Sequence, residues 1–195
     1  MFKDLVLANR SYRGFDEDHK FSKEDLMDLV DYARLMPSGK NSQPFKYFLA
    51  WEDEIVAAIQ PHTKWAGILA ELNLPREGSR PTGFIVVLQD LNIEKSIQAP
   101  QKDVGIVASA ITLAAAEKEL GCCMIGSFSA SGLKKTLNLN ENLAPVFVIA
   151  LGKPTEKIIL KDINADESIA YYRDDNDVHY VPKRRLEDII VPFNS

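Results

Sequence analysis

The hydrophobic and polar positions along the chain predict two main helices. Ser22 and Asp25 form a capping box that begins the first helix, and Pro37 ends it. Its apolar residues recur three or four positions apart: Leu26, Leu29, Val30, Ala33 and Met36. The second helix, over residues 103–120, is apolar or small on most of its faces, which indicates a buried central helix and favours packing against a second subunit. We expect Gly121 to cap this helix. Shorter helices are expected over residues 2–9, 52–59 and 132–137.

Continuous apolar runs predict the strands. Residues 84–88 and 146–151 are apolar throughout, which is typical of strands buried on both faces. Shorter strands are expected over residues 47–51 and 122–125. Two segments are expected to be irregular: residues 60–82, interpreted as a lid with a helical turn around 65–72, and the polar residues 155–181. Because the chain has no repeat and no low-complexity linker, we predict a single α+β domain over residues 1–195, whose partly apolar tail reaches a partner subunit.

Composition narrows the possible partners and the compartment. The chain of 195 residues has a net charge of −5, which argues against nucleic acid as its main partner, because that role needs a broad basic surface. No apolar run is long enough to span a membrane, and no secretory signal precedes the first helix. The only cysteines, Cys122 and Cys123, are adjacent and are expected to lie in the core. We therefore expect a cytoplasmic protein.

Two short basic clusters point to a small anionic ligand. Arg10, Ser11 and Arg13 place two guanidinium groups and a hydroxyl within four residues, a set that can hold one phosphate. Residues 183–185 are a second cluster, Lys-Arg-Arg. Each has an ordinary alternative, a solvated turn after a helix in the first case and a charged surface run in the second. In an acidic chain, the two together indicate convergence on one anion.

Two glycine-containing segments suit a flat ring. Residues 37–45, Pro-Ser-Gly-Lys-Asn-Ser-Gln-Pro-Phe, could offer backbone and amide groups to a planar heterocycle, or could be an ordinary turn. Gly126 could let the backbone approach such a ring, or could let a strand turn. The three histidines lack metal-binding spacing, and hydrolase, P-loop and Rossmann motifs are absent from the sequence. We infer a phosphorylated, planar cofactor.

These segments resemble motifs of the FMN-dependent nitroreductase family. Residues 10–16 resemble its N-terminal R-S-x-R-x-F motif, and residues 37–45 resemble its P-S-x-x-N-x-Q-P-[WF] loop. Asp103 and Gly105 open a small-residue helix as in that family, and residues 183–187 resemble its basic C-terminal motif. The resemblance covers nearly the whole chain. It implies an intertwined homodimer of α+β subunits, each with a central mixed or antiparallel sheet flanked by helices, and two FMN molecules at the interface.

The resemblance also implies roles for individual residues. Arg10 and Ser11 would hold the FMN phosphate together with Lys183 and Arg185, with Arg184 as the alternative if the C-terminal alignment shifts by one. Arg13 would lie near the pyrimidine edge of the flavin. The remaining contacts would come from Pro37, Ser38, Gly39 and Asn41 of the other subunit, and from the backbone of Ile125 and Gly126 near flavin N5.

The implied activity is an NAD(P)H oxidoreductase. Hydride from NADH or NADPH would reach flavin N5 and pass in a ping-pong cycle to a small-molecule acceptor: a nitroaromatic, a quinone or a related electron-poor compound. Arg13 would stabilise the negative charge of the reduced flavin, and no side-chain acid, base or nucleophile is required, because the flavin carries the chemistry. The alternatives are a reductive dehalogenase, a flavin-fragmenting enzyme of the same superfamily, or a flavin-binding protein without turnover.

Overall fold

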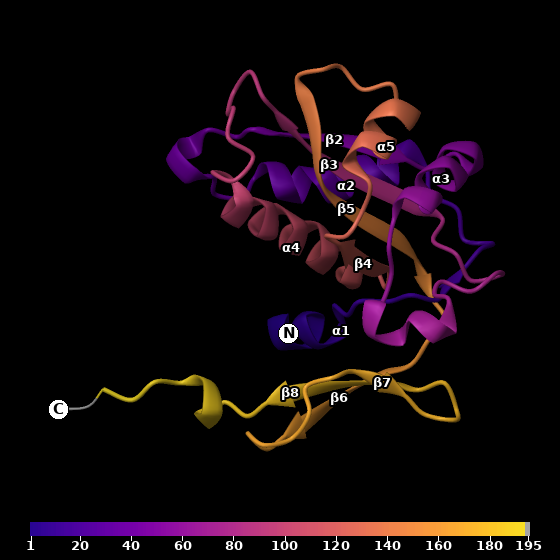
Figure 1. The fold of residues 1–195 in the computed structure, drawn as a ribbon, viewed down its shortest axis with the longest axis vertical. Helices are drawn as coiled ribbons and strands as arrows, with labels where there is room; N and C mark the ends of the chain where they lie inside the picture. The colour runs from indigo at the N-terminus through magenta and orange to yellow at the C-terminus, as the bar shows by residue number, and fades with distance from the viewer. Residues whose placement is uncertain (194–195) are drawn as a thin grey trace.

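A five-stranded sheet lies at the centre of the molecule (Figure 1), whose computed structural model describes residues 1–193. The strands follow the order β1-β5-β3-β2, β4 also pairs with β5, and every pairing is antiparallel. Their bounds are β1 (Phe15–Asp16), β2 (Phe45–Ala50), β3 (Gly83–Asp90), β4 (Gly121–Ile125) and β5 (Leu143–Pro154). The apolar runs expected to be strands therefore all lie in one sheet.

Helices cover both faces of this sheet. On one face lie α2 (Lys23–Arg34) and α4 (Gln101–Glu117), and on the other lie α3 (Asp53–Ile59) and α5 (Ala130–Thr136). Successive residues of β3 point to opposite faces, so that Ile85 packs in the first core and Val86 in the second. A shorter helix, α1 (Phe2–Ala8), lies beside α4. The central strand β3 is buried along its whole length, as its uninterrupted apolar pattern predicts.

The ends of the two main helices show how local sequence sets them. The Ser22–Asp25 capping box is formed: the Ser22 hydroxyl accepts the Asp25 N–H at 3.1 Å, and the Asp25 carboxylate accepts the Ser22 N–H at 2.8 Å. The cap expected at Gly121 is wrong. Glu119 takes the left-handed position, with a φ of 58°, after α4. Gly121 instead begins β4, where a Cβ would lie 2.8 Å from the Tyr12 ring, so the glycine permits a close approach.

The segment between α3 and β3 contains only short helical turns. These are η2 (Gln60–His62) and η3 (Gly67–Leu72), which agrees with the turn expected around residues 65–72. A bridge between Thr63 and Phe128 ties this segment to the loop after β4. Its role as a lid stays a prediction.

Residues 155–181 were expected to be irregular, and this expectation is wrong. They contribute to a second sheet in which β6 (Ile158–Ile163) pairs in parallel with β8 (His179–Arg184), and β7 (Tyr172–Arg173) pairs antiparallel with β8. These strands are mostly partly buried and mix apolar with polar residues. The apolar run Ile158–Leu160 of β6 has only three residues, which is too short to predict a strand. A buried ion pair joins Arg173 to Glu156, and a short turn, η4 (Glu187–Ile189), follows β8.

Two further features bear on the class of protein. Cys122 and Cys123 are buried and free, as expected. Burial raises the pKa of Cys123 to about 11, so this thiol is not an activated nucleophile. Within residues 1–193, none of the helices is long and apolar enough to cross a membrane.

Candidate flavin-binding site

A basic cavity of about 350 Å³ lies between the N-terminal loop, α4, β4 and the second sheet. It brings together four of the expected site residues, Arg10, Ser11, Arg13 and Lys183. The other lining residues are Asn9, Thr112, Cys122, Met124, Tyr171, His179 and Val181. Within the described residues the lining contains no aspartate or glutamate. In a chain of net charge −5, this concentration of positive charge marks the place where an anion would bind.

Pairing with β4 fixes the N-terminal loop at this cavity. Ser11 forms a parallel bridge with Cys122, and the Tyr12 N–H donates to the Cys122 carbonyl at 2.9 Å. Arg10 donates from Nη2 to the Val6 carbonyl of α1 at 2.6 Å. Burial lowers the pKa of Arg10, although an arginine keeps its charge at neutral pH. These contacts hold Arg10 and Ser11 side by side in one loop at the cavity.

Arg13 is held more tightly than the other basic residues. Its side chain is buried, with its guanidinium carbon 5.1 Å from the centre of the Tyr171 ring. Nη1 donates to the Ser11 carbonyl at 3.2 Å, and its backbone N–H donates to Glu156. The Nε atoms of Arg13 and Arg10 are buried without a hydrogen-bond partner in the described part of the chain. Both guanidiniums therefore keep donor capacity for a ligand.

His179 is a cavity residue that sequence reasoning missed. Only 1% of its surface is exposed, and neither ring nitrogen has a hydrogen-bond partner among residues 1–193. Burial, followed by the positive charges of Arg13 and Arg173, lowers its pKa to about 4, so the ring is neutral at pH 7. It lies in the segment expected to be irregular, and the spacing of the three histidines bears only on metal binding. No signal in the sequence distinguishes it.

Side chains along β8 alternate between its two faces, and this alternation shows which C-terminal basic residues of the strand can reach the cavity. Val181 and Lys183 line the cavity, and successive residues of a strand face opposite sides. Arg184 therefore points away from the cavity, which disfavours it as the alternative contact. Arg185 follows the strand and does not line the cavity within one protomer. Its expected contact with the phosphate stays a prediction.

The loop at residues 37–41 lies apart from the basic cavity. Pro37, Ser38, Gly39 and Asn41 are absent from the lining of that cavity. Asp103, in the first turn of α4, holds the loop: its Oδ2 accepts from the Ser38 hydroxyl at 2.9 Å and from the Gly39 N–H at 2.7 Å. One protomer therefore does not bring the two expected halves of the site together. This separation is compatible with a loop that serves the partner subunit.

Ile125 and Gly126 stand at the end of β4, directly after Met124 of the basic cavity. The Ile125 side chain is buried in the core, so only its backbone can face a ligand. A Cβ added at Gly126 would make only an ordinary 3.6 Å contact with Phe147. Packing within the protomer therefore gives no reason for the glycine, which leaves the close approach of a ligand as a reason.

Comparison with known proteins identifies the family. The model of the nitroreductase family matches residues 6–153, most of the chain. The chain belongs to the nitroreductase family. YodC of Bacillus subtilis, provisionally named an NAD(P)H nitroreductase, is 25% identical over 177 residues, which cover 77% of this chain and 88% of YodC.

Solved structures of nitroreductase-family proteins share the fold. A family member from Streptococcus pneumoniae has a TM-score of 0.68 at 18% identity and covers 99% of this chain and 100% of its own. A provisionally named nitroreductase from Exiguobacterium sibiricum, solved in complex with FMN, has a TM-score of 0.65 at 18% identity and covers 80% of this chain and 89% of its own. The expected family, its oxidoreductase class and the α+β fold with a helix-flanked antiparallel sheet are confirmed.

Proposed function

We propose that this nitroreductase-family protein is an FMN-dependent oxidoreductase that takes electrons from NADH or NADPH. The observation that carries the proposal is the basic cavity, where Arg10, Arg13 and Lys183 converge without an acidic neighbour among its lining residues. The buried Nε atoms of Arg10 and Arg13 still lack partners, so the cavity fits an anionic group with several acceptor oxygens. Phosphate is such a group.

The residues divide the work of holding the cofactor. Arg10, Ser11 and Lys183 hold the phosphate, and Arg185 joins them in the dimer. Arg13 lies near the pyrimidine edge, where a fixed and mostly desolvated positive charge stabilises negative charge that develops during reduction. Ile125 and Gly126 offer backbone groups to the ring. When bound, FMN supplies the electron-transfer chemistry between NADH or NADPH and an acceptor such as a nitroaromatic or a quinone, in alternating half-reactions.

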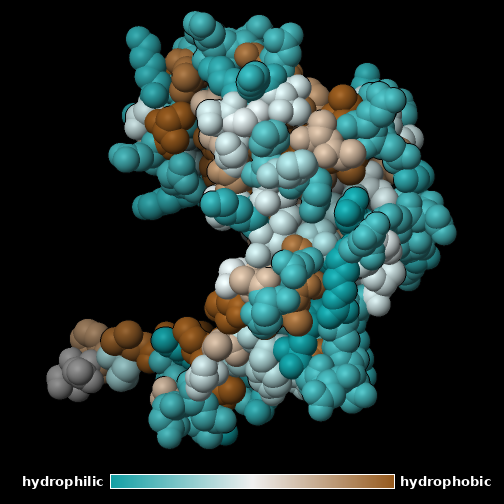
Figure 2. All heavy atoms as spheres, turned by 45° about the vertical axis from the view of Figure 1, so that its right-hand side comes forward, coloured by the Kyte–Doolittle hydropathy of each residue, from teal (hydrophilic) through white to brown (hydrophobic). Residues whose placement is uncertain are grey.

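We also propose that the active form is a homodimer with FMN at the interface. The loop residues Pro37, Ser38, Gly39 and Asn41 lie away from the basic cavity of their own chain and would contact the flavin of the partner. The tail residues Leu186, Ile189, Ile190, Val191 and Phe193 are exposed apolar side chains that need a cover. Figure 2 shows the apolar tail as a segment that projects beside a hollow in the molecular surface. Free, buried cysteines suit the reducing cytoplasm as the location.

The double variant Arg10→Ala, Arg13→Ala tests the cofactor site. Each charged hydrogen bond to a phosphate contributes about 1.5–3 kcal/mol, so the dissociation constant for FMN should rise at least about 100-fold. The protein should purify with little flavin absorbance, whereas the wild type should be yellow and should bleach when NADH or NADPH is added without oxygen. Arg34→Ala, which removes an exposed arginine of α2 paired with Asp31, is the control. Full FMN content in the double variant would contradict the assignment.

A further inference from the structure

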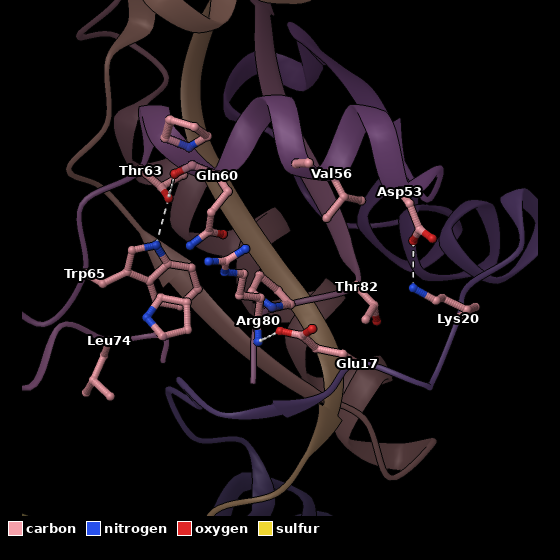
Figure 3. Close-up of a pocket in the computed structure, with 14 residues that line it drawn as sticks. Glu17, Lys20, Asp53, Val56, Gln60, Thr63, Trp65, Leu74, Arg80 and Thr82 are labelled. Carbon is pink, nitrogen blue, oxygen red and sulfur yellow. Dashed lines mark hydrogen bonds and ion pairs between the residues drawn. The ribbon is translucent and has the colours of Figure 1, made fainter. Parts of the chain in front are cut away.

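A second cavity, of about 580 Å³, lies apart from the basic cavity and shares none of its lining residues. We call it the Trp65 cavity. It lies between three parts of the chain: the loop that follows β1, the helix α3 and the segment that leads into β3. Its volume is typical of a small-molecule site. Figure 3 shows Trp65, Gln60, Arg80 and Thr82 around it. The residues expected to hold the flavin are absent from its lining.

Two buried polar atoms in this cavity lack partners. Thr82 is 4% exposed, and its Oγ1 forms no hydrogen bond within residues 1–193. The Oε1 of Gln60 is likewise buried without a donor. Burying a polar group without a hydrogen bond is costly, and most such groups in native proteins have a partner. A ligand that carries a hydrogen-bond donor would supply the missing partner, because an amide oxygen can only accept.

The charges of the cavity leave one cation available. Lys20 is paired with Asp53 at 2.7 Å, and Glu17 accepts the backbone N–H of Arg80 at 2.7 Å. The guanidinium of Arg80 forms no ion pair or hydrogen bond in the described chain, and Figure 3 shows it extending toward Gln60 and Trp65. A guanidinium fork matches a carboxylate. The neighbouring carboxylates of Glu17 and Asp53 disfavour a doubly charged phosphate.

The apolar part of the lining suits a flat ring. The Trp65 indole is fixed in place, because its Nε1–H donates to the Thr63 hydroxyl at 2.7 Å. Pro61 and Pro75 add further apolar ring surfaces to the lining. Rigid aromatic and proline surfaces bind planar apolar groups at low entropic cost.

We propose that the Trp65 cavity binds a small monocyclic aromatic carboxylate whose ring carries a hydroxyl or amino group. Arg80 takes the carboxylate, the ring lies against Trp65 and Pro75, and the hydroxyl or amino group pairs with Gln60 or Thr82. The inference stands on this cavity alone and does not depend on the flavin site.

Calorimetric titration of the purified protein, with its bound cofactor, tests the proposal. The probes are para-, meta- and ortho-hydroxybenzoate, unsubstituted benzoate and the neutral para-hydroxybenzamide. At least one hydroxybenzoate should bind saturably, more tightly than benzoate, and the neutral amide should bind at least about tenfold more weakly than its acid. The flavin absorbance should persist throughout.

Three variants locate the binding. Arg80→Gln should lower the affinity for the best-binding probe at least about tenfold. Arg34→Gln, which removes an exposed arginine outside the cavity, should leave this affinity unchanged. Thr82→Val should reduce the difference in affinity between hydroxybenzoate and benzoate. The proposal would be overturned if none of the isomers bound saturably, or if the probe displaced the flavin. It would also be overturned if the Arg80→Gln protein kept its melting temperature and bound the probe as tightly as the wild type.

Discussion

At the scale of single residues, the basic cavity combines three cations with one neutral imidazole. A protonated His179 would add a fourth positive charge within reach of Arg13 and Arg173 in a buried place, so the fold keeps the ring neutral. A neutral imidazole can donate or accept a hydrogen bond, and it therefore adds polar capacity to the cavity without further repulsion.

This arrangement predicts how stability depends on pH. The pKa of His179 is about 4 in the folded protein and about 6.5 when unfolded, so the unfolded chain binds more protons between these values, and stability falls on acidification through that window. From pH 7 to pH 5 the protein should lose about 2 kcal/mol of unfolding free energy through this residue. Urea unfolding at both pH values measures it. His179→Phe should remove most of this loss, and equal losses in both proteins would refute the role of His179.

At the scale of elements, the first turn of α4 positions the loop that precedes β2. Asp103 accepts from both the Ser38 hydroxyl and the Gly39 N–H, and Lys40 and Asn41 then take left-handed backbone conformations, with φ values of 55° and 53°. Hydrogen bonds to a carboxylate are stronger than neutral ones, and here they hold a loop whose backbone is strained. Asp103 is thus a positioning residue for the proposed partner-side contacts.

Asp103→Ala should release this loop. Losing hydrogen bonds worth about 2 kcal/mol should speed amide hydrogen exchange at Gly39 roughly 30-fold, while the remainder of α4 stays protected. FMN affinity should fall in parallel, because the loop would no longer be preorganised. Asp28→Ala, which breaks an exposed pair between α2 and Lys118, is the matched control. Faster exchange at Gly39 with unchanged FMN affinity would show that the loop does not contact the flavin.

The elements also show which parts of the fold the sequence could predict. The buried strand β3 and the helices α2 and α4 follow from apolar periodicity and from the Ser22 capping box, because burial itself imposes those patterns. The second sheet does not, because β6 and β8 are short, partly buried strands that mix apolar with polar residues, so they show neither a long apolar run nor a clean alternation. His179 was missed because it lies on β8. The basic residues Arg10, Arg13 and Lys183 were predicted by motif and do converge, whereas Arg185 and the loop at residues 37–41 do not meet them within one protomer.

At the scale of the whole molecule, the tail is the part that a single subunit cannot explain. After β8 the chain leaves the body of the protein, and Figure 1 shows this segment extending away from both sheets. Val191 and Phe193 are at least 90% exposed. Burying one such side chain contributes about 1.5–3 kcal/mol, so a subunit that covers several of them gains substantial free energy. Complementary placement of the tail and the loop at residues 37–41 would complete two sites at once in a symmetric dimer.

Truncation after Arg185 tests whether the tail is needed for the dimer while the basic cavity of each subunit stays intact. The shortened chain keeps Arg10, Arg13 and Lys183 but lacks the apolar tail from Leu186 onward. The full-length protein should have the mass of a dimer in light scattering after gel filtration, and the truncated protein that of a monomer with reduced FMN content, because the partner's loop is lost. The double change Ile93→Ser, Ile97→Ser, which alters exposed apolar residues far from the tail in sequence, should leave the dimer intact. A full-length monomer that retains FMN would show that one chain forms the whole site, and that residues 37–41 have another role.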